Sequence, residues 1–170
     1  MSKTLKNKIF DNWIAAIIIL PVNVLIIIPV ILHYLTSFSF DNPGILQIIF
    51  SLITGIIGLF FAVWSMLTSK SKGDGTPAPW APPKNFVATG PYKYVRNPMI
   101  SGVIFMLFSE FCITLSTAIF LWFIAFTILN LIYIHFIEEP QLKKRFGTSY
   151  EEYLKKVPCW IPSLKKIRNF

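Results

Sequence analysis

Residues 98–136 read PMISGVIFMLFSEFCITLSTAIFLWFIAFTILNLIYIHF, a run of 39 residues that is apolar except for Glu110 and His135. A helix rises about 1.5 Å per residue, so about 20 residues cross the ~30 Å hydrocarbon layer of a bilayer. The run is too long for one crossing and has a suitable length for a tight hairpin of two helices. We therefore expect spans at 98–114 and 116–137, with the turn near residues 114–117.

Two further runs come earlier in the chain. Residues 13–36 contain no charged residue apart from His33, and residues 44–67 contain none. Each run has 24 residues and reaches about 36 Å as a helix, which is enough for one crossing. A cleaved signal peptide is the alternative for the first run, but the run is long and no small-residue cleavage site follows it. Two more spans are therefore predicted.

Prolines and glycines inside these runs predict local features. Pro21 and Pro29 should kink the first span, which neighbouring helices can tolerate in lipid. Gly55 and Gly58 predict a close approach of two helices within the second span.

The composition agrees with a membrane protein. Hydrophobic residues make up 54% of the 170 residues and charged residues 14%, and the mean hydropathy is +0.60. Such a chain is too apolar for a water-soluble domain. We expect an all-α, polytopic membrane protein with four transmembrane helices, a cytoplasmic connector and a C-terminal tail. Residues 1–170 should form a single domain.

The positions of the charges predict the orientation. The chain has 16 Lys and Arg and a net charge of +8. All 16 lie in the N-terminal leader, between Lys70 and Arg96, or between Lys143 and Arg168. The positive-inside rule therefore places both termini in the cytoplasm, and it explains the charge without a nucleic-acid partner. Cys112 and Cys159 should lie at opposite ends of the bundle, and neither a disulfide nor a metal site is indicated.

One polar segment lies between the second and third predicted spans, and another follows the fourth. Residues 68–97 contain TPAPWAPPK, which is too rich in proline for a helix and should run extended along the membrane surface. The tail predicts a short helix at 140–146 that ends at Gly147. A second helix should open at Ser149, with Glu152 completing its capping box.

The residues around Asn97 indicate the start of a helix. Asn is favoured as an N-cap, and Pro98 is favoured in the first turn. The free N–H groups of such a helix start bind carboxylates and phosphates, and Arg96 adds a positive charge. Gly102 leaves space beside the helix one turn later. An ordinary capped membrane helix with an interfacial arginine is the alternative.

Glu138 and Glu139 directly follow an apolar span, and His135 lies one turn earlier on a shared face. An unpaired acid at bilayer depth costs about 2.5 to 3.5 kcal/mol, so acids this close to the core are usually functional or paired. Neutralisation by Lys143 or Arg145 is the alternative explanation.

Two segments match a family in order and spacing. They are GDGTPAPWAPPKNFVATGPYKYVRNPMISG, starting at Gly73, and EEPQLKKRFGTSYEEYLKKVPCWIP, ending at Pro162. Together they resemble the integral-membrane methyltransferases that include isoprenylcysteine carboxyl methyltransferase and the phospholipid methyltransferases. The resemblance covers about half of the chain.

The resemblance implies that S-adenosylmethionine is the methyl donor and that it binds within regions 73–102 and 135–162. The matching cofactor-binding positions are Gly90, Tyr92, Arg96, Asn97, Pro98 and Gly102 in the first motif, and Glu138 and Glu139, with His135 beside them, in the second. The catalytic candidates are Glu139, Arg96 and Arg145. The acceptor would be a lipid or a prenylated molecule that enters from the bilayer.

The donor brings the reactive methyl group, so the protein needs to align it with an acceptor and to exclude water. An amine or hydroxyl acceptor would need a base, for which Glu139 and His135 are the candidates, while Arg96 or Arg145 would orient an anionic group. Three departures from the family pattern, at Asn97, Ile100 and Cys159, leave the acceptor open between a prenylcysteine carboxylate and a phospholipid amine.

Two other functions fit parts of the sequence. Membrane sterol reductases resemble this family in their C-terminal motifs and bind NADPH, although they usually have more spans. A small helical membrane protein without enzymatic activity would use the same acids and arginines to anchor the ends of its spans.

Overall fold

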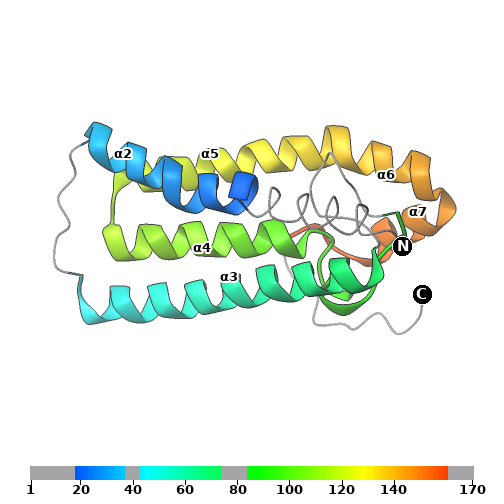
Figure 1. Ribbon diagram of the computed structural model, residues 1–170, viewed down its shortest axis with the longest axis horizontal. Helices are drawn as coiled ribbons and strands as arrows, with labels where there is room; N and C mark the ends of the chain where they lie inside the picture. Colours follow the sequence, from blue (N-terminus) through cyan, green and yellow to red (C-terminus); the bar gives the residue numbers. More distant parts are fainter. Residues whose placement is uncertain (1–17, 37–42, 74–83, 161–170) are drawn as a thin grey trace, which may run out of the picture.

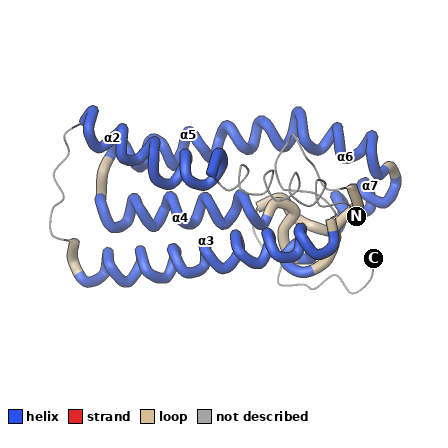
Figure 2. Tube along the Cα trace, in the orientation of Figure 1, coloured by secondary structure: helices blue, strands red, loops and turns tan. Residues whose placement is uncertain are grey.

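The computed structural model describes residues 18–36, 43–73 and 84–160 (Figure 1). These residues form helices and loops, with no strand among them (Figure 2). The helical elements in chain order are η1 (Ile18–Ile27), α2 (Ile28–Thr36), α3 (Ile45–Lys72), η2 (Gly90–Lys93), α4 (Pro98–Thr114), α5 (Thr117–Tyr133), η3 (Ile134–Glu138), α6 (Glu139–Phe146) and α7 (Thr148–Lys156). The predicted all-α class is confirmed for the described residues.

The long helices run side by side along the longest axis of the molecule (Figure 1). Helix α4 packs between α3 and α5, and α2 lies against α5. Helix α6 continues the direction of α5, and α7 folds back at the same end. This end of the bundle therefore brings together the start of α4 and both short helices of the tail.

Two helices are long and apolar enough to cross a membrane: Ile45–Lys72 with 28 residues and Thr117–Phe146 with 30 residues. The helices Pro21–Thr36 and Pro98–Thr114 are also apolar but shorter. Helix α4 has 17 residues and is about 26 Å long, slightly less than the hydrocarbon thickness. The structure thus supports a membrane protein, and the count of four crossings stays a prediction.

Several predicted boundaries change. Helix α3 continues to Lys72, so the first five residues assigned to the polar connector belong to the helix. Its last turn carries Lys70 and Lys72, whose charges are favourable at a helix C-terminus. The proline-rich core of the connector lies almost wholly outside the described residues, as do the basic leader, the turn at residues 37–42 and residues 161–170. The first span is described from Ile18, and its turns around Pro21 are π-helical.

Small residues allow α3 and α4 to approach closely, as Gly55 and Gly58 predict. A Cβ on Gly58 would lie 2.6 Å from the carbonyl oxygen of Gly102, and a Cβ on Gly102 would lie 2.6 Å from that of Gly58. About two turns away, the Ser109 hydroxyl donates to the backbone oxygen of Ser51 at 2.8 Å. These contacts make the α3–α4 pair the tightly packed half of the molecule.

The turn between α4 and α5 lies where the sequence predicts it. Helix α4 ends at Thr114, and Leu115 follows in the left-handed region with φ of 48°. Ser116 then caps α5, because its hydroxyl accepts a hydrogen bond from the Ile119 N–H at 3.4 Å. The two helices form the expected hairpin.

The last long helix contains one wide turn. The Glu139 N–H donates to the carbonyl of Ile134, five residues back, which makes the turn at η3 π-helical. Pro140 follows directly and has no N–H to donate, so the regular hydrogen-bond ladder is interrupted at this point. The helix predicted at residues 140–146 therefore begins at Glu139 and continues the preceding span, and it ends at Gly147 as predicted.

The predicted start of the final helix is wrong, because the predicted N-cap, Ser149, lies two residues after the observed one. Gly147 has φ of 58°, ends α6 and is also the N-cap of α7, which begins at Thr148. Its carbonyl accepts from the N–H groups of Tyr150 and Glu151. Ser149 lies inside the helix and is not its cap, so the predicted capping box with Glu152 does not form.

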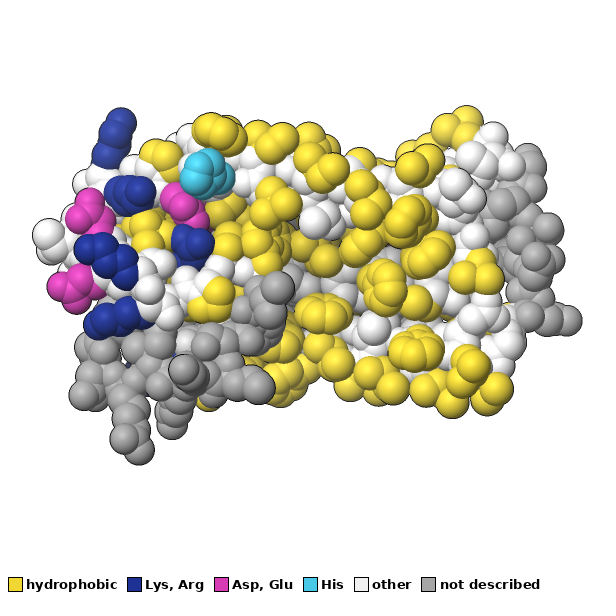
Figure 3. All heavy atoms as spheres, turned by 180° about the vertical axis from the view of Figure 1, so that it is seen from behind, with side chains coloured by type: hydrophobic (Ala, Val, Ile, Leu, Met, Phe, Trp, Pro, Cys, Tyr) yellow, Lys and Arg dark blue, Asp and Glu magenta, His cyan; other side chains and the backbone are white. Residues whose placement is uncertain are grey.

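Charged side chains gather at one end of the molecule on the face seen in Figure 3, whereas hydrophobic side chains cover most of the rest. Many large apolar side chains of α2, α3 and α5 are exposed, including Tyr34, Phe60 and Ile132. An apolar belt next to a charged end is the surface that a bilayer and its headgroups require. Cys112 and Cys159 are both free.

Candidate active site

The segment before α4 is held against α3 and α7 by hydrogen bonds. The hydroxyls of Tyr92 and Ser65 lie 3.0 Å apart, and the Tyr153 hydroxyl donates to the Tyr92 carbonyl at 2.7 Å. Burial raises the pKa of Tyr92, which keeps its hydroxyl neutral. Gly90 has φ of +60°, and a Cβ there would lie 2.7 Å from Oγ1 of Thr68. A glycine is therefore needed where this segment touches α3.

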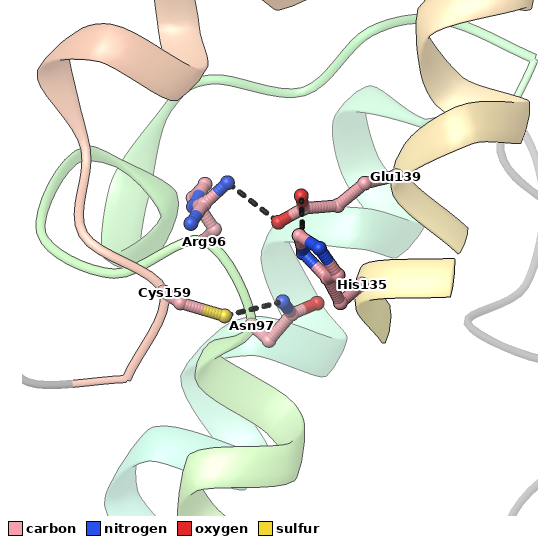
Figure 4. A network of polar contacts seen from close by, with 5 residues as sticks. All are labelled: Arg96, Asn97, His135, Glu139 and Cys159. Carbon is pink, nitrogen blue, oxygen red and sulfur yellow. Dashed lines mark hydrogen bonds and ion pairs between the residues drawn. The ribbon is translucent and has the colours of Figure 1, made fainter. Parts of the chain in front are cut away.

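Figure 4 shows Arg96 in a group of polar contacts, where a dashed line joins it to Glu139. Its backbone N–H donates to the carbonyl of Pro158 at 2.9 Å, and its Nη1 donates to Oε1 of Glu139 at 2.5 Å. The Arg96 Nε is buried and has no hydrogen-bond partner among the described residues. A buried unpaired N–H is costly, so this atom lacks the partner that buried polar groups usually have.

Asn97 is the N-cap residue of α4, as predicted, but its side chain does not cap the helix. Its Nδ2 instead points to the Cys159 Sγ at 3.8 Å (Figure 4). Burial raises the pKa of the Cys159 thiol, so the sulfur stays neutral beside the amide. Contacts from Pro158 and Cys159 thus hold the tail against the start of α4.

The two glutamates differ in their surroundings. Oε2 of Glu139 lies 3.9 Å from Nδ1 of His135, which confirms the shared face predicted for His135 and one glutamate. Glu139 also accepts from Arg96 and has a side chain only 10% exposed. Glu138 lines a separate cavity. Successive helix residues point about 100° apart, so neighbouring acids can serve different spaces.

The cavity that Glu138 lines, here called the inner cavity, has a volume of about 370 Å³. One part of its wall is polar and aromatic and includes Tyr92, Arg96, Asn97, Glu138, Arg145 and Tyr150. The other part is apolar and includes Pro21, Val24, Ile100, Val103 and Phe126. The cavity therefore joins the charged end of the bundle to the space between its apolar helices.

A second space, here called the outer hollow, has a volume of about 360 Å³. It is lined by Arg96, Leu131, Ile132, Ile134, His135, Phe136, Glu139, Cys159 and Trp160. Arg96 is the residue that lines both spaces. The Arg96–Glu139 ion pair therefore lies at the boundary between them.

The predicted site residues divide into three groups. The inner cavity brings together Tyr92, Arg96, Asn97, Pro98, Glu138 and Arg145. His135 and Glu139 lie in the outer hollow beside Arg96. Gly90 and Gly102 line neither space and instead pack against α3. Their assignment to cofactor binding stays a prediction.

Several residues that line the inner cavity were not predicted from the sequence. Tyr150 and Tyr153 line the inner cavity from α7, where their spacing of three residues puts both on one helix face. Asn130 also lines the cavity, and its Nδ2 donates to the carbonyl of Phe126 at 2.8 Å. Asn130 could have been found from the sequence, because it is a lone amide inside an apolar run and polar groups at membrane depth are usually functional.

Comparison with known proteins identifies the family. Residues 46–149, more than half of the chain, match the family described as phospholipid methyltransferase. The matched region extends from α3 to the start of α7 and contains the Arg96–Glu139 pair. No curated protein and no solved structure matches the chain. The sequence match, the helical fold and the apolar surface agree, and we conclude that this chain belongs to the phospholipid methyltransferase family.

Proposed function

We propose that this protein transfers a methyl group from S-adenosylmethionine to a lipid acceptor within the inner cavity. The observation that carries the proposal is the junction of a charged wall and an apolar wall in one cavity. A charged donor and the head of a lipid need these two environments next to each other. Membership of a methyltransferase family supports the same chemistry.

The cavity fits the donor in size and in chemistry. A volume of about 370 Å³ lies within the usual range of about 300 to 1,000 Å³ for small-molecule sites. The α4 N-terminus and the positive charge of Arg96, which both line the cavity, suit the carboxylate of the donor. Glu138 suits its ammonium group, and the ring of Tyr150 offers an aromatic wall for the adenine.

When it is bound, the donor supplies an electrophilic methyl group. The protein would hold the acceptor atom in line with this methyl group and keep water out, which can contribute about 7 to 11 kcal/mol. A carboxylate acceptor needs no base. An amine acceptor releases a proton, for which the Glu138 carboxylate faces the cavity and Glu139 and His135 lie behind Arg96.

Arg96 and Arg145 divide the charged part of the cavity between them. Glu139 holds Arg96 in place, so Glu139 acts in this proposal as a positioning residue. Arg145 lines the cavity from α6 and would orient an anionic group of the acceptor. The acceptor classes in this proposal are a phospholipid amine and a prenylcysteine carboxylate.

The orientation completes the proposal. Since all 16 basic residues lie in segments that one side of the membrane can contain, the positive-inside rule supports four crossings with both termini in the cytoplasm. The inner cavity would then open at the cytoplasmic face, where soluble S-adenosylmethionine is available. Residues 1–170 would act as one domain.

Calorimetry of the purified chain tests the choice of donor. We expect binding of S-adenosylmethionine and none of NADPH, the cofactor of the sterol reductases. Transfer of a labelled methyl group into a total lipid extract would then identify the acceptor. Absence of heat with S-adenosylmethionine would contradict the proposal.

A substitution at Glu138 tests the geometry. Glu138→Gln removes the negative charge from the cavity, and we expect donor affinity to fall about tenfold or more because a charge-assisted hydrogen bond is lost. Glu151→Gln is the matched control, since Glu151 is exposed on α7. Equal affinities of both variants would place the donor elsewhere.

A further inference from the structure

A hydrogen bond joins η1 to α5 beside the inner cavity. The Trp122 Nε1 donates to the carbonyl oxygen of Val24 at 3.1 Å, and the two residues lie 98 positions apart in the chain. Helix η1, which contains Val24, packs against α4, whereas its backbone has few neighbours on α5. The bond therefore ties together two helices that backbone packing leaves apart.

The Val24 carbonyl needs this donor because of a proline. In a π-helix each carbonyl accepts from the N–H five residues later, which for Val24 is the position of Pro29. Proline has no N–H, and the π-helical turns end at Ile27. Membrane helices tolerate prolines where a neighbouring helix supplies the missing partner. The indole of Trp122 is thus the partner that the π-helical turns of η1 lack.

The same face of α5 continues into the inner cavity. Trp122, Phe126 and Asn130 are spaced four residues apart and lie on one helix face. The ring centroids of Trp122 and Phe126 are 6.0 Å apart, and Asn130 donates to the Phe126 carbonyl at 2.8 Å. Phe126 and Asn130 line the cavity from α5, and Pro21 and Val24 line it from η1. Trp122 therefore joins two walls of the cavity without lining the cavity itself.

We propose that Trp122 is a positioning residue for the lipid acceptor. Its hydrogen bond to Val24 fixes the distance between η1 and α5, and this distance sets the width of the apolar part of the inner cavity. The inference rests on the proposed function, in which the acceptor occupies this part. The methyl donor would be little affected, because Arg96 and Glu138 line the cavity from other elements.

Hydrogen exchange in Trp122→Phe tests the contact, because this variant keeps an aromatic ring and loses the N–H. We expect amide exchange of residues 18–36 to become about five- to tenfold faster in the purified full-length chain, measured in detergent without donor or acceptor. Trp64→Phe is the matched control, since Trp64 lies on α3 against Phe60 and Tyr94 and does not line the inner cavity. Equal exchange of residues 18–36 in the two variants would overturn the proposal.

Methyl-transfer kinetics separate positioning from a general loss of stability. In Trp122→Phe we expect the KM for the acceptor to rise about fivefold, with kcat and the affinity for S-adenosylmethionine nearly unchanged. The acceptor probes are phosphatidylethanolamine and an N-acetylated farnesylcysteine, one for each proposed acceptor class. A fall in kcat at constant KM, or a loss of donor affinity, would contradict a role on the acceptor side.

A second substitution separates the hydrogen bond from the shape of the ring. Pro29→Ala gives the Val24 carbonyl an N–H within its own helix, so a donor on α5 is no longer needed. In this background, Trp122→Phe should change the exchange rate and the KM by less than about twofold. An undiminished effect would show that Trp122 acts through packing alone, which would overturn the proposal.

Two outcomes distinguish this inference from the proposed function. Unchanged exchange in Trp122→Phe, together with methyl transfer by the unmodified chain, would overturn the positioning role alone. Absence of donor binding and of methyl transfer in the unmodified chain would overturn the proposed function, and with it any role of Trp122 toward an acceptor, whatever the exchange rates are.

Discussion

The two sides of α4 are built on different principles. Toward α3, Gly58 faces Gly102 and the hydroxyls of Ser51 and Ser109 lie 3.0 Å apart, so the two backbones come close together. Toward η1, α5 and α6, larger side chains such as Phe126 line a cavity of about 370 Å³. The size of the side chains therefore distinguishes the α3–α4 contact, which holds the fold together, from the side of α4 that lines the candidate active site. Small residues join helices, and large or charged residues leave a space between them.

We expect the largest effect on stability from a substitution that adds a side chain to the close contact between α3 and α4. In Gly102→Val, the added side chain would meet the Gly58 carbonyl and the Ala62 backbone N, which lie 2.6 and 2.8 Å from an ideal Cβ. Neither backbone atom can move easily, so we expect a loss of about 3 kcal/mol or more in the free energy of unfolding. Thermal unfolding in detergent measures this loss.

Ala125→Val is the control for that change, because Ala125 is exposed on α5. It adds methyl groups to the apolar surface without a close neighbour helix and should change stability little. Similar stabilities of the two variants would mean that the α3–α4 contact is not the scaffold.

A substitution at the candidate active site, on the side of α4 away from α3, should lower activity and leave folding intact. Glu139→Gln removes the charge that holds Arg96. We expect turnover to fall about 100-fold, since a misplacement of about 1 Å at a reacting centre can have this effect. Methyl-transfer assays measure the loss, and thermal unfolding reports whether the helices remain assembled.

Glu152→Gln serves as the comparison for Glu139→Gln, since Glu152 is exposed on α7. It should retain full turnover. Unchanged methyl transfer by Glu139→Gln would remove Glu139 from the site and leave its ion pair with Arg96 a structural contact.

We expect the smallest effect on stability from removal of a serine hydroxyl between α3 and α4. Ser109→Ala removes its hydrogen bond to the Ser51 backbone. Hydrogen bonds between membrane helices average about 0.6 kcal/mol, so the free energy of unfolding should fall by about this amount. Ser71→Ala, at an exposed position of α3, is the control. A loss as large as that of Gly102→Val would mean that hydroxyls, more than glycines, hold the two helices together.

Local rules predicted much of the framework. The start of α4 at Asn97 and Pro98 follows from capping preferences. The hairpin turn follows from the length of the apolar run, which is too long for a single membrane span. The shared face of His135 and Glu139 follows from helix periodicity. These features depend on residues close together in the sequence, and for that reason pattern and spacing are sufficient to find them.

Other features depend on contacts between distant segments. The interruption at Pro140 is visible in the sequence, but the resulting π-helical turn and the separation of Glu138 from Glu139 depend on packing around the helix. The Arg96–Glu139 ion pair joins residues 43 positions apart. The final helix begins at Thr148 because Gly147 adopts a positive φ, which a capping-box pattern does not reveal.

The amino-acid order alone was sufficient to establish a helical membrane protein, the start of the helix beside Arg96, and a resemblance to membrane methyltransferases. Hydropathy, capping and short-range periodicity act within one or two turns, so no folded structure is needed to recognise them. The division of the predicted site into an inner cavity and an outer hollow emerged from the assembled helices. The space between side chains depends on how whole helices pack, so it cannot be predicted from residues that are neighbours in the sequence.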